Sequence, residues 1–355
     1  MKKFVALLAL SGAFFSSFAD VTVQVPQQVI PGQSITIPAD PGLSKRIADL
    51  EAAVSVLQGA PAPTPPASTP VPPVVPASSI AAADVFAELD ANKPFAQQKG
   101  GAGLECAGVG VGGVSSLSDS AGYFNSTSPA GKRFGKVADP LDPSKQVLLF
   151  APTRNDSTAG GGGSKRCEVS WWTVQSGSIK PYVDIWHAFG LLMPDGGYDF
   201  QAVISQYHQT TSQTVNPWSA IQAEKDRLML FVRSNTNSPP TQATNQTRTF
   251  ASPGIPKTKW TVFVIKMRID PRAGGQGYFQ AWRDGVQFAN YAGPTGYATI
   301  DQNPTWQKFG FYPWDYANWS SPTAVRVLFK APVYVKDPTG SKYSESDLRS
   351  YVLAR

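Results

Sequence analysis

The strongest constraint on the fold is a succession of short, strand-like segments separated by clusters of turn-forming residues. Beyond residue 140, runs rich in Val, Ile, Phe, Tyr and Trp alternate with clusters of Gly, Pro, Asn and Asp. The expected strands are Gln146–Phe150, Arg166–Thr173, Val183–Leu192, Phe200–Tyr207, Arg227–Arg233, Trp260–Ile269, Gly277–Arg283, Lys308–Tyr312 and Arg326–Val335. Helical periodicity is scarce outside Ile80–Asp90 and Ser344–Val352. This spacing predicts an all-β antiparallel sandwich or jelly roll.

The remaining chain divides by composition. Residues 60–79 are rich in proline, which leaves few backbone donors and favours an extended linker. The roughly 275 residues of 80–355 are enough to bury the core of one large domain. Residues 20–59 are expected to form a β arm and a short helix. An a/d heptad stripe over residues 43–57 predicts either weak homo-oligomerisation or an amphipathic helix docked on the arm.

The amino terminus has the three parts of a secretory signal peptide. Residues 1–19 combine a basic start, an apolar run from Phe4 to Phe15 and a small-x-small cleavage site ending at Ala19. The run is too short to span a bilayer, which takes roughly 20 apolar residues, and no later segment is longer. The sequence therefore predicts a secreted protein without a membrane span, located outside the cell, at the cell surface or in the periplasm.

The charge balance bears on the partner. The formal net charge is +6, and the basic residues are spread along the chain rather than gathered in a tail. This balance favours an anionic partner. Nucleic acid is not expected, because the chain has no Lys/Arg-rich run and is predicted to leave the cytoplasm.

Two cysteines remain in a chain destined for an oxidising compartment. Under those conditions Cys106 and Cys167 are expected to form a disulfide. Two Cys and two His are too few for a typical zinc site, and no metal site is predicted. No cofactor is required by the sequence, and calcium stays an open alternative because no loop of alternating oxygen ligands locates it.

The common hydrolytic constellations are missing from the sequence. A β-sandwich glycosidase needs two acids that flank one bond, commonly on one strand face, and no such acidic cluster is present. A nucleophilic triad is equally unsupported, since there is no GxSxG motif and only His187 and His208 could act as a base. A place in the core or along a groove is expected for His187.

Several segments carry polar residues in strand-like alternation. The segment Ser164–Trp172 places Arg166, Glu168 and Ser170 on one face, and Gln206 shares a face with His208. The segment Trp306–Tyr312 likewise places Lys308 and Tyr312 opposite two phenylalanines.

Seven short motifs follow one another along residues 130–335: Asp139-Pro-Leu-Asp142, Arg166-Cys-Glu168, Phe189-Gly-Leu-Leu-Met-Pro194, Gln206-Tyr-His208, Trp260-Thr-Val-Phe-Val264, Trp282-Arg-Asp-Gly285 and Lys308-Phe-Gly-Phe-Tyr312. In these motifs and their order, the chain resembles the β-jelly-roll polysaccharide lyases that include heparin lyase I and glucuronan lyase. The resemblance implies a concanavalin-like β-jelly-roll and an enzyme that cleaves an acidic, uronic-acid-containing polysaccharide by β-elimination.

The resemblance implies one role for each of five residues. Arg166, with Gln206 or Lys308, would bind the uronate and stabilise the charge that develops when the C5 proton leaves. His208 would be the base for C5. Tyr312 would protonate the leaving O4, or act as both acid and base. No metal ligand is assigned.

Each role has a structural alternative. Arg166 and Glu168 can be a same-face ion pair without any catalytic part. His208 can be an ordinary histidine at the end of a strand. Tyr312 and Lys308 can be solvent-facing residues of the sheet.

Three tryptophans also have two interpretations. Trp218, Trp314 and Trp319 lie in expected loops beside small and polar residues. A flat indole there can stack on a sugar face or cap the end of a sheet.

Two other functions compete with the lyase. A non-catalytic glycan-binding or adhesion module would use the same fold, the linker and the heptad helix. A hydrolase would use dispersed acids such as Glu168 and Asp284.

Overall fold

A computed structural model describes residues 80–94, 97–100, 102–106, 133–156, 165–171, 179–209, 215–252, 254–300 and 305–355. The chain divides into two compact units, Met1–Pro73 and Val74–Arg355, and every described residue belongs to the second. The expected signal peptide (1–19), arm and helix (20–59, with the stripe 43–57) and proline linker (60–79) lie outside the described residues. These assignments and the domain boundary at residue 80 stay predictions.

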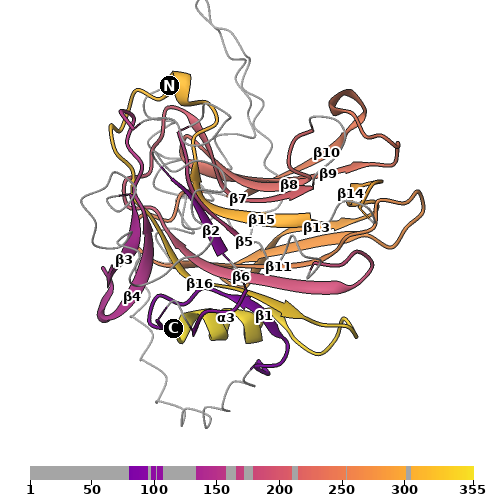
Figure 1. Cartoon of the computed structure of the whole chain (residues 1–355), viewed down its shortest axis with the longest axis horizontal. Helices are drawn as coiled ribbons and strands as arrows, with labels where there is room; N and C mark the ends of the chain where they lie inside the picture. The colour runs from indigo at the N-terminus through magenta and orange to yellow at the C-terminus, as the bar shows by residue number, and fades with distance from the viewer. Residues whose placement is uncertain are drawn as a thin grey trace, which may run out of the picture. The chain divides into compact units, whose positions relative to one another are not determined.

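The described domain consists of two stacked sheets of antiparallel strands (Figure 1). The first sheet has the order β13 (Val286–Ala292), β12 (Tyr278–Arg283), β11 (Thr261–Arg268), β6 (Asp184–Leu192), β16 (Val327–Lys336), β4 (Asp142–Phe150) and β3 (Phe134–Asp139), with β1 (Val85–Glu88) paired to β16. The second sheet has the order β10 (Gln246–Ser252), β9 (Arg227–Asn235), β8 (Ser219–Glu224), β7 (Gln201–Gln209), β15 (Thr305–Tyr312), β5 (Cys167–Trp171) and β2 (Ala102–Cys106). The short β14 (Gly296–Tyr297) pairs in parallel with β9. This architecture confirms the predicted β-jelly-roll.

The core lies between the sheets and is rich in aromatic side chains. Alternate residues of each strand point inward, so Phe309 and Phe311 of β15 are fully buried together with Trp171 of β5. From the first sheet, Phe189 and Phe329 pack among them, with ring centroids 5.5 Å apart. Because this aromatic layer covers the inner face of the second sheet, only the outer face of that sheet can carry a groove.

The first sheet is covered on its outer face by the C-terminal helix α3 (Glu345–Leu353), seen below β6 and β16 in Figure 1. Strand β6 is buried along its whole length because one face meets the core and the other lies in the layer under α3. Ser344 and Asp347 form a capping box at the start of the helix. The helix expected at Ser344–Val352 is thereby confirmed.

The helix expected at Ile80–Asp90 is wrong. Residues 85–88 form β1, which pairs antiparallel with β16. Val85, Ala87 and Leu89 are all buried, and this two-residue spacing belongs to a strand. The alanines of this segment favour a helix, but helix propensity is a weak local preference. Pairing with β16 and burial of the strand outweigh it.

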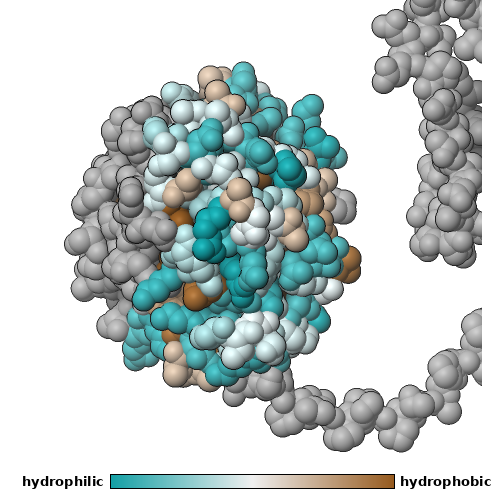
Figure 2. All heavy atoms as spheres, turned by 90° about the vertical axis from the view of Figure 1, so that its right-hand side faces the viewer, coloured by the Kyte–Doolittle hydropathy of each residue, from teal (hydrophilic) through white to brown (hydrophobic). Residues whose placement is uncertain are grey.

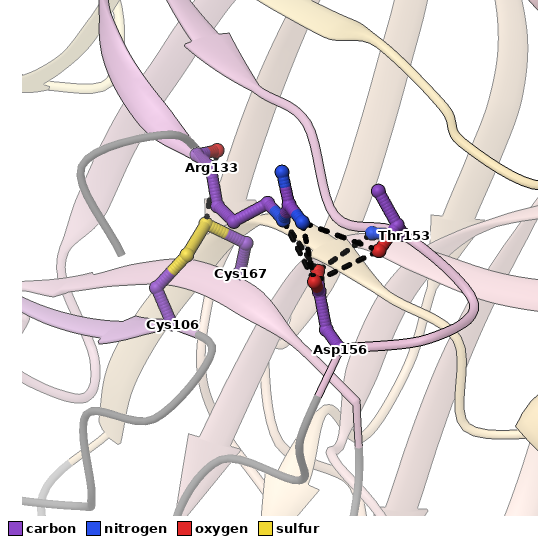
Figure 3. Close-up of a disulfide and its surroundings, with 5 residues drawn as sticks. All are labelled: Cys106, Arg133, Thr153, Asp156 and Cys167. Atoms are coloured by element: carbon purple, nitrogen blue, oxygen red, sulfur yellow. Dashed lines mark hydrogen bonds and ion pairs between the residues drawn. A yellow bond between two sulfur atoms is a disulfide. The ribbon is translucent and has the colours of Figure 1, made fainter. Parts of the chain in front are cut away.

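The expected disulfide between Cys106 and Cys167 is confirmed. It joins the last residue of β2 to the first residue of β5, two antiparallel neighbours, and both cysteines are fully buried (Figure 3). The Sγ atom of Cys167 lies 3.3 Å from the backbone oxygen of Arg133, whose guanidinium binds Asp156. The bridge therefore ties β2 to β5 at one end of the second sheet, next to the segment that precedes β3.

The outer surface of the domain is mainly polar. Figure 2 shows one face of the domain, which is mainly hydrophilic with isolated hydrophobic residues. Scattered exposed apolar residues of this kind are normal for a monomeric surface. Among the described residues, no helix combines the length and the apolar character needed to cross a membrane.

Gly310 is required where β15 bends. Its φ is +138°, and an added Cβ would overlap the Cys167 carbonyl oxygen and lie 2.8 Å from the Cα of Glu168. We expect Gly310→Ala to lower the free energy of unfolding by about 3 kcal/mol, because backbone strain and overlap with β5 combine. Urea denaturation measures this change.

Gly274→Ala is the matched control for Gly310. Gly274 also has a positive φ, +71°, but no atom lies within 4 Å of an added Cβ. Only backbone strain then acts, and a loss of about 1 kcal/mol is expected. Equal losses for the two variants would contradict the requirement for Gly310.

Candidate active site

A groove of about 450 Å³ lies on the face of the second sheet that points away from the core. Its floor comes from outward-facing residues of β7, β8, β9 and β15, and Arg166 reaches it from the residue just before β5. All five residues predicted to form the site line this groove: Arg166, Gln206, His208, Lys308 and Tyr312. The structure thus places them together, while their roles stay predictions.

The register between β7 and β15 brings these side chains next to one another. Lys308 stands directly opposite Gln206, and Trp306 stands opposite His208. Because side chains alternate along a strand, these four share the groove face while Phe309 points into the core. The register shifts between Phe309 and Tyr312, which is a bulge that re-aims the end of β15.

An ion cluster occupies one end of the groove. Arg166 Nη1 lies 3.2 Å from Glu105 Oε2 and 3.4 Å from Glu168 Oε2. Lys308 Nζ lies 2.7 Å from Glu105 Oε1, so Glu105 joins the two cations. Gln206 Nε2 donates to Glu168 Oε1 at 2.6 Å. All three residues predicted to bind the uronate are thereby held in place by carboxylates of the protein itself.

Burial sets the electrostatics of this cluster. Glu168 is fully buried, and burial raises the pKa of its carboxyl despite the nearby charges of Arg166 and Lys308. The pKa of Arg166 is raised, because the charges of Glu168 and Glu105 outweigh the effect of its burial. The guanidinium is therefore permanently charged.

His208 is held as a neutral ring. Its imidazole stacks on the Trp306 indole, with ring centroids 4.8 Å apart and planes 20° apart. Burial, followed by the positive charges of Lys308 and Arg166, lowers the pKa of His208 to about 4. Nδ1 is buried without a hydrogen-bond partner among the described residues. At neutral pH the imidazole is therefore unprotonated and has the form that a general base needs.

Tyr312 completes the polar part of the groove. The Arg166 guanidinium carbon lies 4.1 Å from the centroid of the Tyr312 ring, a cation–π contact that holds the phenol against the cluster. Trp314 follows at the rim and is 45% exposed. The groove thus offers a neutral base, a phenol, two ordered cations and an exposed indole. This set can bind a carboxylate and transfer protons beside it.

Sequence reasoning missed Trp306 and Arg233, which line the groove, and Glu105, which pairs with two of its cations. The contact between Glu105 and Arg166 could not be predicted, because strand β2 was not expected. The two residues meet only because β2 pairs with the distant strand β5. Trp306 precedes the segment Lys308–Tyr312 that was expected as a strand, while the strand itself begins at Thr305. Arg233 ends the segment Arg227–Arg233, whose alternation places it on the same face as Phe231.

Other candidates lie elsewhere. Trp218 and Trp319 are buried and cannot stack on a sugar, so of the three tryptophans only Trp314 remains available. The motif residue Trp282 belongs to the first sheet, where it stacks on Trp186. His187 is buried in the core with Nδ1 2.6 Å from the Tyr207 hydroxyl, as expected.

The acids proposed for a hydrolase do not share a site. Glu168 is fully buried under the groove, whereas Asp284 forms the turn between β12 and β13 in the first sheet. Two acids must flank one bond for glycoside hydrolysis. This separation contradicts the hydrolase hypothesis for Glu168 and Asp284. Within the described ranges, no three His, Cys, Asp or Glu residues gather in a way that would hold a metal ion.

Several solved structures align with the chain at low sequence identity. An endo-β-1,4-glucuronan lyase from the fungus Trichoderma reesei aligns with a TM-score of 0.46 and 14% identity, covering 57% of this chain and 87% of that one. An alginate lyase of polysaccharide lyase family 7 aligns with a TM-score of 0.45 and 12% identity, covering 67% and 96%. An alginate lyase from Pseudomonas aeruginosa aligns with a TM-score of 0.39 and 17% identity, covering 57% and 85%.

Sequence comparisons address the family directly. No protein with a curated description matches the chain. A family model described as polysaccharide lyase matches residues 115–329, which is more than half of the chain and includes β3 to β15 with the groove between them. From this match and the β-jelly-roll, we conclude that the chain belongs to the polysaccharide lyase family and is a lyase.

Proposed function

We propose that the protein is a secreted lyase that cleaves an acidic, uronic-acid-containing polysaccharide by β-elimination. One observation carries this proposal: Arg166, Gln206, His208, Lys308 and Tyr312 line a single groove. A groove lined by cations and a neutral histidine, with its acids buried beneath, suits an anionic polymer better than a neutral one. The predicted signal peptide supports secretion.

The reaction begins with recognition of one uronate. The Arg166 guanidinium binds the carboxylate attached to C5, and the Gln206 amide and Lys308 lie next to it. Neutralising that carboxylate makes the C5 proton more acidic, because the electron pair left at C5 spreads onto the carboxylate oxygens. The cations are held by Glu105 and Glu168, so little reorganisation is needed when this charge develops.

Proton transfer then breaks one bond of the polymer. His208 takes the C5 proton, and Nε2 is the nitrogen for this step because Nδ1 is buried. The electron pair of the C5–H bond forms a double bond between C4 and C5. The C4–O4 bond breaks, and Tyr312 donates its phenolic proton to the departing oxygen. The products are a new reducing end and an unsaturated uronate, and no water is consumed.

The unsaturated product gives a direct test. Mature protein is incubated with glucuronan, alginate and heparin, and the ultraviolet absorbance of the C4=C5 bond is followed. Absorbance that grows with enzyme on at least one polyuronate is expected. Binding to these polymers without any absorbance would instead support a non-catalytic glycan-binding module and overturn the proposed reaction.

The pH dependence of kcat/KM reports His208 in the free enzyme. The base must be neutral, so activity is lost as pH falls through its pKa. Because the pKa of His208 is lowered to about 4 from the usual 6.5, the acid limb is expected near pH 4. Circular dichroism at each pH separates this loss from acid unfolding.

Lys308→Met sharpens the pH test. Lys308 is one of the positive charges that lower the pKa of His208. Removing it is expected to raise that pKa and move the acid limb of kcat/KM to higher pH. An acid limb near 6.5 in the unmodified enzyme, or a limb that stays in place in Lys308→Met, would contradict the role of His208.

A further inference from the structure

The three groove-lining cations differ in their partners. Arg166 and Lys308 are each within ion-pair distance of Glu105. Arg233 also lines the groove but forms no ion pair with any residue that the structure describes. Its Nη1 donates to the backbone oxygen of Pro217 at 2.6 Å, and its guanidinium carbon lies 5.2 Å from the centre of the Phe231 ring. Among the described residues, Arg233 is therefore a positive charge without a carboxylate beside it.

Burial makes this lone charge costly. Arg233 is half-buried, and desolvation lowers the pKa of its guanidinium. When a carboxylate forms charge-assisted hydrogen bonds to a buried cation, these bonds offset the cost of the hydration that the cation has lost. The protein supplies such a carboxylate to Arg166 and Lys308 but, in the described part of the chain, not to Arg233.

The sheet places Arg233 two strands away from His208 on the groove face. His208 belongs to β7 and Arg233 to β9, and β8 lies between these two strands. Both side chains line the groove. Neighbouring strands lie about 4.8 Å apart, so β7 and β9 are about 10 Å apart. Trp306 of β15 stands opposite His208 on the other side of β7.

We propose that Arg233 forms a second anion-binding subsite, which takes the carboxylate of another uronate of the same polymer as the one at His208. This inference rests on the proposed function, because it assumes that a polyuronate lies in the groove. A polymer that crosses the strands brings one carboxylate to Arg166 and another to Arg233. The sugar between the two positions needs no charge. Arg233 thereby favours the binding of polymers that carry several uronates over polymers that carry a single uronate.

Binding and turnover of glucuronan and alginate oligomers test the subsite. Arg233→Gln is expected to weaken the binding of long oligomers about tenfold by isothermal titration calorimetry. Their KM should rise by a similar factor, with kcat nearly unchanged, because Arg233 does not touch the reacting atoms. Oligomers too short to reach both positions should show no change in KM.

Two variants accompany Arg233→Gln. Arg233→Lys keeps the charge and is expected to restore most of the affinity, which excludes a general effect of losing the Pro217 contact. Arg227→Gln removes an exposed arginine from the other end of the same strand, outside the groove, and should bind like the unmodified protein. Thermal melting verifies that each variant is folded.

The two proposals can fail separately. Equal affinity of Arg233→Gln and unmodified protein for long oligomers, or a loss confined to kcat, would overturn the subsite while leaving the lyase reaction intact. Absence of unsaturated product with every polymer would overturn the proposed function, and calorimetry would still decide whether Arg233 binds the anionic chain.

Discussion

Replacing His208 with alanine is expected to lower kcat on the preferred polyuronate by about a thousandfold, because general base catalysis typically contributes 10²- to 10⁴-fold. No other histidine can substitute: His187 is buried in the core, and burial lowers its pKa to about 3. The affinity for polymer should change little, since Arg166, Lys308 and Gln206 remain. Initial rates from ultraviolet absorbance, with calorimetric binding in parallel, measure both quantities.

Tyr312→Phe removes only the phenolic oxygen and should lower kcat by a similar factor. Tyr316→Phe is the matched control, because Tyr316 is an exposed tyrosine of the nearby η6 (Tyr316–Asn318) outside the groove. Catalytic groups that act together lose their effects non-additively, so the variant lacking both His208 and Tyr312 should be hardly slower than the worse single variant. If His208→Ala keeps a rate within about threefold of the unmodified enzyme, His208 is not the base.

Removing the disulfide has the largest expected effect on stability. Cys106 and Cys167 are 61 residues apart, so the bridge restricts the unfolded chain over a long loop. Replacing both with alanine is expected to lower the free energy of unfolding by about 4 kcal/mol at 25 °C. Guanidinium denaturation of the double variant measures the loss.

The same variant tests how the groove is held. The bridge pins β2 to β5 next to Glu105, which faces Glu168 across the two strands. If the pinning positions Glu105, the folded double variant should also show a reduced kcat. A loss of stability below about 1 kcal/mol would contradict the account, because it would mean that the bridge adds little to the strand pairing.

The predicted features of the fold were those that depend on local pattern. Alternation along the segment Lys308–Tyr312 correctly separated groove residues from the core residues Phe309 and Phe311. The apolar run of the expected strand Val183–Leu192 and the expected helix Ser344–Val352 are equally local. Each needs only the two-residue or 3.6-residue period and the chemistry of neighbouring residues.

The rest depends on pairing between distant segments. Glu105 reaches Arg166 because β2 pairs with β5, and no local pattern announces that partner. The strands β3, β8 and β13 were not expected; β8 and β13 mix small and polar residues, and β3 begins with the glycine-containing Phe134–Gly135. The same reason explains why Arg233 was not connected with His208, since the two share the groove only through the order of three strands.

The central claim is that a bond of an acidic polymer breaks by elimination at one groove. Mass spectrometry of the products from a defined polyuronate oligomer tests it most directly. Each new non-reducing end should be lighter by one water than the saturated oligomer of the same length, and this species should vanish in His208→Ala and Tyr312→Phe. Saturated products that have gained the elements of water would show hydrolysis and contradict the account.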